Sequence, residues 1–202
     1  PFTEIGFNFK NRDIAEKSNF KYFPYNKGGG FRKWYGLNEF VVQFNNDGLD
    51  IRNRRKNSGQ SFSLPGEKYY FKPSVSWADI TSSINSFRFY PQGFIFDVKG
   101  QSAFSDFYSH NFCLSILNTN LISHLMPILN PTISFQSGNF KQLPFLNDVD
   151  NSLNIQKAID SAKKDWDSYE TSWDFTENPI ICTQQPNLEQ AFNTWQQQNA
   201  DA

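Results

Sequence analysis

The stretch Glu-Phe-Val-Val-Gln-Phe at positions 39–44, followed by Asn-Asn-Asp-Gly at positions 45–48, decides the fold class of this chain. β-Branched and aromatic residues fill the first segment, which predicts a strand. The Asp-Gly pair tolerates positive φ, so the second segment predicts a turn. Together the two segments indicate that the N-terminal half is built from short strands joined by turns.

Further strand candidates lie on both sides of this stretch. Aromatic runs flank the triplet Gly28-Gly29-Gly30, and Pro91-Gln92-Gly93 separates two later runs as a hairpin turn would. Residues 53–66 are polar, basic and rich in Ser and Gly, so we expect a long loop there. The additional predicted strand segments are 21–25, 31–35, 69–71, 75–77, 86–90 and 94–98.

Helical periodicity begins near Phe107. Apolar residues between 111 and 129 recur at spacings of three and four, which predicts a helix broken at residues 118–120 and ended by Pro131. We expect a short strand at 132–135 and one helical turn at 139–143.

The last quarter of the chain is predicted to be helical as well. Apolar residues from Leu153 to Trp173 recur at spacings of three and four, so they share one face of a long helix. Asn151 or Ser152 can cap its start. An irregular linker at 175–186 and an amphipathic helix at 188–198 complete the chain.

These elements predict an α+β domain. We expect a twisted, mostly antiparallel sheet, a helical unit at about 107–130 packed on it, and a helical C-terminal extension. The predicted boundary separates a main domain, residues 1–150, from an extension, residues 151–202.

The composition fits a folded domain with an uneven charge. The 202 residues carry a net charge of −1, which excludes a histone-like polycation, and 17% aromatic residues, which can build a core. Residues 1–75 have a net charge of +6, residues 76–150 of −2 and residues 151–202 of −5. This asymmetry favours a surface that faces a polyanion, and a chance distribution over solvated faces is the open alternative.

The cysteines and the N-terminus limit the cellular setting. Cys113 and Cys182 are far apart without Cys-x-x-Cys spacing, which speaks against a disulfide scaffold or a four-ligand zinc site and favours a cytoplasmic protein. No basic and apolar leader and no run of 18 apolar residues is visible, so we expect neither a secretory signal nor a membrane span. The start at Pro1 indicates a fragment of a longer protein.

Catalytic motifs are scarce. His110 and His124 lie in or beside the predicted helical region, where structural roles are common, and no third group orients a His110–Cys113 pair. The glycine triplet has the spacing of neither a Walker A loop nor a Gly-x-Gly-x-x-Gly cofactor loop. We therefore expect no catalytic residue and no metal site.

Two basic clusters point instead to nucleic acid. Glycines let backbone amides approach a phosphate closely, and the flanking Lys and Arg side chains add charge-assisted hydrogen bonds. In the second cluster, Arg can read guanine and Asn can read adenine, whereas a solvated basic loop is the alternative. The clusters comprise Lys27, Arg32 and Lys33 with the interleaved aromatics Tyr25, Phe31, Trp34 and Tyr35, and Arg52, Arg54, Arg55 and Lys56 with Asn53 and Asn57.

Several of these segments resemble a known family. Residues 22–36, Tyr-Phe-Pro-Tyr-Asn-Lys-Gly-Gly-Gly-Phe-Arg-Lys-Trp-Tyr-Gly, resemble a signature segment of the PglX-type adenine-specific DNA methyltransferases of BREX phage-defence systems. The order of elements also resembles the target-recognition domains of type I and TaqI-like modification enzymes. The resemblance extends over roughly residues 22–173, with similar segments at 46–53, 86–97, 100–102, 116–133 and 135–138.

The departures from this family define which part of it the chain resembles. Such enzymes carry an Asn-Pro-Pro-Tyr-like motif, but Asn130-Pro131-Thr132-Ile133 lacks the second proline and the aromatic residue. No Phe-x-Gly-x-Gly cofactor loop is present either. The resemblance therefore implies a DNA target-recognition domain at residues 1–150, cut away from a catalytic domain that would bind S-adenosylmethionine and methylate adenine at N6. The fragment alone is expected to be no enzyme and to hold no cofactor.

The resemblance implies double-stranded DNA, the catalytic domain of the same parent chain and other defence-system proteins as partners. A protein-interaction module without DNA contact and a complete small enzyme are the alternatives. The predicted DNA-binding residues are Lys27, Gly28, Gly29, Gly30, Arg32, Lys33, Trp34, Arg52, Arg54, Arg55 and Lys56, with Gln101 and Ser102 of second rank.

Overall fold

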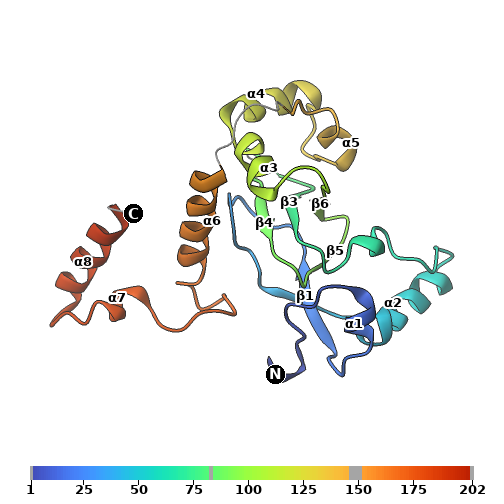
Figure 1. The fold of residues 1–202 in the computed structure, drawn as a ribbon, viewed down its shortest axis with the longest axis horizontal. Helices are drawn as coiled ribbons and strands as arrows, with labels where there is room; N and C mark the ends of the chain where they lie inside the picture. Colours follow the sequence, from blue (N-terminus) through green and yellow to red (C-terminus); the bar gives the residue numbers. More distant parts are fainter. Residues whose placement is uncertain (1, 82–83, 146–151, 201–202) are drawn as a thin grey trace.

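The computed structural model describes residues 2–81, 84–145 and 152–200 and combines helices with two small sheets (Figure 1). Sheet A has the strand order β2-β1-β5, and sheet B has the order β4-β3-β6. The α+β class is confirmed, but the single predicted sheet is divided into two. The strands are β1 (Tyr22–Asn26), β2 (Phe40–Gln43), β3 (Ser74–Ala78), β4 (Arg88–Tyr90), β5 (Ile95–Phe96) and β6 (Gly100–Ala103).

Most strand pairs are antiparallel, as predicted, and β1–β5 is the parallel exception. The predicted hairpin at Pro91-Gln92-Gly93 is wrong, because the turn joins β4 of sheet B to β5 of sheet A. The residues after this turn do not pair back with β4, because they form backbone hydrogen bonds with Phe71, which lies far away along the chain. The Phe71 amide donates to the Phe94 carbonyl at 2.8 Å, and the Gly93 amide donates to the Phe71 carbonyl at 3.0 Å.

The helices follow the predicted periodicity closely between residues 110 and 129. Thr119 separates two helices there, and its hydroxyl accepts the Ile122 amide at 3.3 Å as an N-cap. The helical elements are η1 (Phe2–Glu4), α1 (Arg12–Glu16), α2 (Asn45–Asn57), η2 (Glu67–Tyr69), α3 (His110–Leu117), α4 (Asn120–Leu129), α5 (Ser137–Phe140), α6 (Ser152–Trp166), α7 (Pro179–Cys182) and α8 (Leu188–Ala200).

Three predicted segments have another structure. Residues 53–57 lie in α2 instead of a loop. The predicted strand at 69–71 is absent, because Tyr69 ends η2 and residues 70 and 71 form a turn. Residues 31–35 form no strand, because Trp34 has a φ of 72° and makes only an isolated bridge to Arg88. The predicted turn at 45–48 is confirmed, although these residues fall within the bounds of α2. Asn46, Asp47 and Gly48 have left-handed φ values of 51°, 54° and 68°, which a right-handed helix does not contain.

Helix α6 ends at Trp166, seven residues before the predicted end. The chain folds back there, and the Ser172 hydroxyl donates to Asp167 at 2.7 Å. Trp173 then packs against Phe94 and Phe7 with ring-centroid separations of 6.0 and 5.2 Å. Trp173 therefore fits the helical spacing of apolar residues because it packs beside sheet A, although it lies beyond the end of α6. The predicted cap Asn151 and the predicted domain boundary lie outside the described residues.

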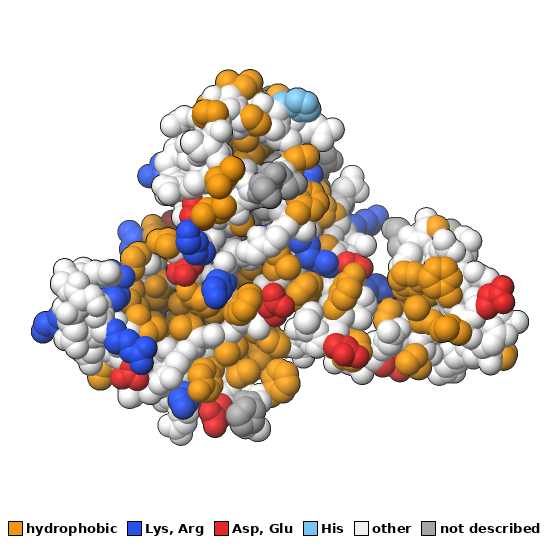
Figure 2. Space-filling model, turned by 180° about the vertical axis from the view of Figure 1, so that it is seen from behind, with side chains coloured by type: hydrophobic (Ala, Val, Ile, Leu, Met, Phe, Trp, Pro, Cys, Tyr) orange, Lys and Arg blue, Asp and Glu red, His pale blue; other side chains and the backbone are white. Residues whose placement is uncertain are grey.

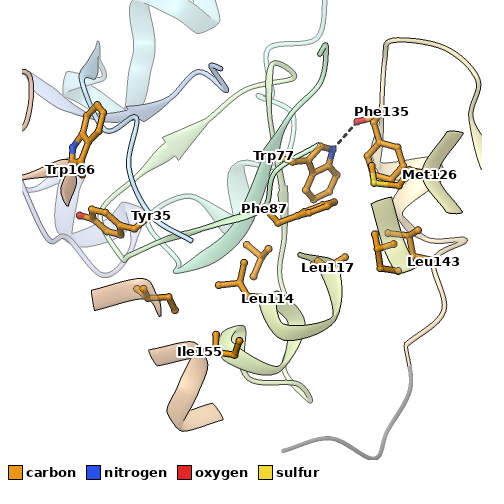
Figure 3. Close-up of a cluster of buried hydrophobic side chains, with 13 residues drawn as sticks. Tyr35, Trp77, Phe87, Leu114, Leu117, Met126, Phe135, Leu143, Ile155 and Trp166 are labelled. Atoms are coloured by element: carbon orange, nitrogen blue, oxygen red, sulfur yellow. Dashed lines mark hydrogen bonds between the residues drawn. The ribbon is translucent and has the colours of Figure 1, made fainter. Parts of the chain in front are cut away.

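The larger of two apolar cores joins sheet B to α3, α4 and α6 (Figure 3). Trp77 is fully buried at its centre, and its indole N–H donates to the Phe135 carbonyl at 2.7 Å. The predicted packing of the 107–130 unit on a sheet is thereby confirmed. Phe23, Phe44 and Phe71 build the second core under sheet A.

No single helix of the described ranges is long and apolar enough to cross a membrane. The α3–α4 pair passes that test only when both helices are counted together, and it is bent by 72°.

Candidate nucleic-acid interface

Helix α2 carries the second basic cluster, and its first member faces the interior. Arg52 is 5% exposed, and its guanidinium bonds Asp47 Oδ2 at 2.8 Å and Glu67 Oε2 at 2.6 Å. Arg12 reaches the same two carboxylates. Arg52 therefore holds α2 against η2, and the predicted contact with DNA would require it to leave these two carboxylates.

The other members of this cluster point to solvent. Arg54 and Lys56 are exposed, whereas Arg55 is half-buried and donates to the Ser61 carbonyl at 3.2 Å. All three lie in the last turn of α2, where positive charge interacts favourably with the helix dipole. Asn53 and Asn57 are exposed on the same helix. The outer face of α2 therefore offers cationic groups and amide donors together.

The glycine triplet is not an open phosphate loop along its whole length. Gly28 is buried with a φ of 80°, and a Cβ at this position would lie 2.6 Å from the Lys99 carbonyl oxygen. Its amide donates to Asn26 Oδ1 at 3.0 Å. Gly29 and Gly30 are exposed, and nothing lies within 4 Å of a Cβ built on Gly30. Only the second half of the triplet is open to a ligand.

Arg88, which no motif in the sequence marks, holds the glycine loop from its buried side. Its side chain is fully buried, and the guanidinium donates to the Gly28 carbonyl at 2.8 Å and the Arg32 carbonyl at 3.4 Å. Its Nε has no hydrogen-bond partner among the described residues. The spacing of Arg-Phe-Tyr at 88–90 signals only a strand, so nothing local predicts this contact.

The cations that follow the glycines are also engaged. Arg32 bonds Asp165 at 2.5 Å and lies 5.1 Å from the Trp166 ring centroid, which ties the loop to α6. Lys33 donates to the Asn118 carbonyl at 2.9 Å, at the end of α3. Trp34 is half-buried against the larger core. These three residues therefore stabilise the fold, and their contact with DNA stays a prediction.

The second-rank candidates lie at the junction of the two sheets. Asn26 is 1% exposed, and its amide donates to Ser76 at 2.6 Å and to Ser102 at 3.3 Å. Gln101 donates to the Val98 carbonyl at 2.8 Å and closes the turn before β6. Gln101 and Ser102 are both half-exposed, and each has a hydrogen-bond partner within the chain.

Exposed cations remain on one face of the molecule. Figure 2 shows Lys and Arg side chains spread from the α2 end toward the middle of this face, among apolar side chains. Lys27 is exposed beside the glycines, 5.2 Å from the Phe40 ring centroid. Lys99 is about half exposed and pairs with Asp79 at 3.1 Å. The candidate interface therefore consists of Lys27, Gly29, Gly30, Arg54, Arg55 and Lys56.

The described residues offer little for catalysis. Burial raises the pKa of the Cys113 thiol to about 11, which disfavours the reactive thiolate, and burial lowers the pKa of His110, which favours its neutral form. The Asn130 side chain accepts the Thr132 amide at 3.1 Å and serves its own turn. No group of three or more potential metal ligands is found among the described ranges.

Comparison with known proteins gives two relatives. No protein-family model matches the chain. The adenine-specific methyltransferase PglX of Lacticaseibacillus casei (strain Zhang) is 37% identical over 191 residues, or 89% of this chain. The adenine-specific methyltransferase BrxX of Escherichia coli O9:H4 (strain HS) is 32% identical over 172 residues, or 84% of this chain. The chain spans only 16% and 14% of the lengths of these relatives.

Proposed function

This chain is homologous to a segment of the PglX-type adenine-specific methyltransferases, and we propose that it is the part of a longer DNA methyltransferase that reads the DNA target. In this proposal, the parent enzyme methylates adenine at N6 within a BREX phage-defence system. Another part of the parent binds S-adenosylmethionine and takes the flipped adenine. The segment described above selects which adenine is presented.

The observation that carries the proposal is the outward face of α2. Arg54 and Lys56 are exposed there, next to the exposed amides of Asn53 and Asn57. An α-helix fits the major groove of B-DNA, Asn can pair with an adenine edge, and Lys or Arg can neutralise phosphates. Because the residue that anchors the helix, Arg52, is itself buried, the helix keeps a fixed orientation toward a duplex.

The glycine segment contributes a second contact in this proposal. Lys27 and the exposed Gly29 and Gly30 would approach a phosphate, while Asn26 and Arg88 hold the buried Gly28 by hydrogen bonds. Phosphate contacts of this kind position a protein on DNA, whereas base contacts select the sequence. We therefore assign orientation to the glycine segment and selection to α2.

Fluorescence anisotropy with a DNA duplex over a salt series tests the proposal. Arg54→Ala with Lys56→Ala removes two exposed cations, so the slope of log K against log salt should fall in magnitude by about 2. Lys157→Ala with Lys164→Ala is the matched control, because both side chains are exposed on the acidic C-terminal quarter. No binding at low salt, or an equal loss in the control, would refute DNA reading by this surface.

Calorimetry with S-adenosylmethionine tests the division of labour. The chain alone should bind none, since the cofactor belongs to another part of the parent in this proposal. Tight binding would contradict that division.

A docking role is the second candidate, favoured by the surface of the α7–α8 unit. Ile181 and Leu188 are 70% and 75% exposed, and Phe192 is 44% exposed. Residues 151–202 have a net charge of −5, which suits a protein surface better than DNA. Hydrogen exchange distinguishes the roles: docking predicts that α8 is protected in the full-length parent but not in this chain.

A further inference from the structure

The loop that joins β6 to α3 (Figure 1) carries the most exposed large apolar side chain in the described ranges. Phe107 is 95% exposed on this loop. The Ser105 hydroxyl oxygen accepts the amide of Phe107 at 3.1 Å and the amide of Tyr108 at 2.8 Å. A local turn of this kind fixes the backbone on which the exposed ring is mounted.

Stacked rings hold the loop on both sides of Phe107. Phe104 stacks on Tyr69 with ring centroids 4.7 Å apart, and Tyr108 stacks on Phe112 with ring centroids 5.1 Å apart. Phe107 is therefore an apolar knob on a supported loop. A preorganised group of this kind loses little conformational freedom when it binds.

An apolar cavity of about 250 Å³ lies beside the knob. Phe104 and Tyr108 of the same loop line it, together with Cys113 of α3 and Phe140 of α5, and no Lys, Arg, Asp or Glu does. An apolar cavity of about 150 Å³ already accommodates a benzene ring. The cavity therefore has room for a phenyl side chain, and Phe107 of the same chain points into solvent instead.

Charges of both signs surround the knob and the cavity. Lys68 and Lys72 are exposed, with their Nζ atoms 4.8 and 5.5 Å from the centroid of the Tyr69 ring, which stacks on Phe104 at the cavity wall. Asp106 is exposed at the knob itself. Within the described ranges, these three charged groups form no ion pair. A phenyl group that enters the cavity with a carboxylate beside it would therefore meet two available lysines.

We propose that two copies of this chain associate through this patch, each inserting Phe107 into the cavity of the other. Knob and cavity share one loop, so a single two-fold axis near Asp106 allows both insertions at once, as in an isologous contact. The same axis brings Asp106 of one copy toward Lys68 and Lys72 of its partner. A second copy supplies the knob, the cavity and both signs of charge by construction, and a net charge of −1 sets up little repulsion between copies. This association goes beyond the proposed function and does not depend on it.

Sedimentation velocity over a concentration series tests the association. We expect a monomer–dimer equilibrium whose Kd rises at least tenfold in Phe107→Ser, because a buried aromatic anchor typically dominates an interface. Phe31→Ser is the matched control, since Phe31 is also an exposed aromatic residue on a loop, at 57% exposure, and should leave the Kd unchanged. Thermal unfolding at low concentration accompanies both variants, and neither Tm should fall because both rings are exposed.

Charge reversal gives a second test, which a structural role would not pass. Asp106→Lys alone should weaken the dimer, as should Lys68→Asp with Lys72→Asp. The variant that combines all three changes should recover the affinity, because the pairs across the interface are restored with opposite sign.

Three results would overturn the proposal. They are a chain that stays monomeric up to about 1 mM, a Kd that Phe107→Ser leaves unchanged, and a dimer lost in Leu188→Ser with Phe192→Ser but kept in Phe107→Ser, which would assign the contact to α8. Arg54→Ala with Lys56→Ala should leave the dimer intact, so failure of the DNA proposal is distinguishable from failure of this one.

Discussion

Arg52→Ala should lower the free energy of unfolding by about 3 kcal/mol. Removing one partner of a buried ion pair typically costs about 3–5 kcal/mol, because the remaining charge loses its compensation. Here the side chains of Asp47 and Glu67 are 19% and 23% exposed, and Arg12 still reaches both, so the low end of that range applies. For a chain of this length, about 3 kcal/mol corresponds to a fall in Tm of about 6–12 °C.

Urea denaturation followed by tryptophan fluorescence measures this loss, with Arg54→Ala as the matched control. Arg54 lies two residues away on the same helix but is exposed, so its replacement should change stability by less than about 0.5 kcal/mol. The m-value should be unchanged in both variants, which keeps the comparison one of stability.

Equal stability of the two variants would refute the structural role of Arg52. Arg52→Lys gives a finer check, because a lysine keeps the charge but cannot bond two carboxylates in the planar geometry of a guanidinium. It should lie between the parent sequence and the alanine variant. DNA affinity should be compared only under conditions in which each variant is folded.

Three other predictions concern the glycine loop, the C-terminal helix and the thiols. Gly28→Ala should destabilise the fold by about 2 kcal/mol or more in urea denaturation, since its φ of 80° and the Lys99 carbonyl at 2.6 Å both oppose a side chain, while Gly30→Ala should be neutral. Arg32→Ala should speed hydrogen exchange in α6 at least several-fold because it removes the contacts with Asp165 and Trp166, and unchanged exchange relative to Lys164→Ala would contradict this. Cys182 is exposed and should react with a disulfide reagent at pH 8, whereas Cys113 should not. Burial raises the pKa of the Cys113 thiol to about 11. The protonated thiol therefore contributes stability below about pH 9, and this contribution is lost as the pH rises toward 11.

The orientation of α2 explains how one basic cluster is divided between the protein interior and the solvent. Arg54 follows Arg52 by two residues and therefore points to the opposite side of the helix, so Arg52 reaches Asp47 and Glu67 while Arg54 faces solvent. Lys56 lies one turn after Arg52 and is exposed near the end of the helix. A loop would give no such separation. The prediction of a loop was wrong for residues 53–57, because this part of α2 lacks the apolar periodicity by which a helix is recognised in a sequence.

The sequence by itself determined the features that depend on neighbouring residues. The break between α3 and α4, the positive φ values at 46–48 and the strand at 40–43 all follow from local chemistry. The homology to PglX-type methyltransferases could also be seen in the residues themselves, because it rests on the order of side chains along the chain.

Only the tertiary structure decided which polar groups are buried and which face solvent. Arg32 and Asp165 are separated by 133 residues, and Asn26 and Ser76 by 50, so no spacing along the chain predicts either contact. Burying a charge or an amide is favourable only where a partner arrives from another element, and the fold supplies it for Arg52 but not for Asn38. The same residue types therefore became anchors, exposed cations or an unpaired amide according to the long-range contacts around them.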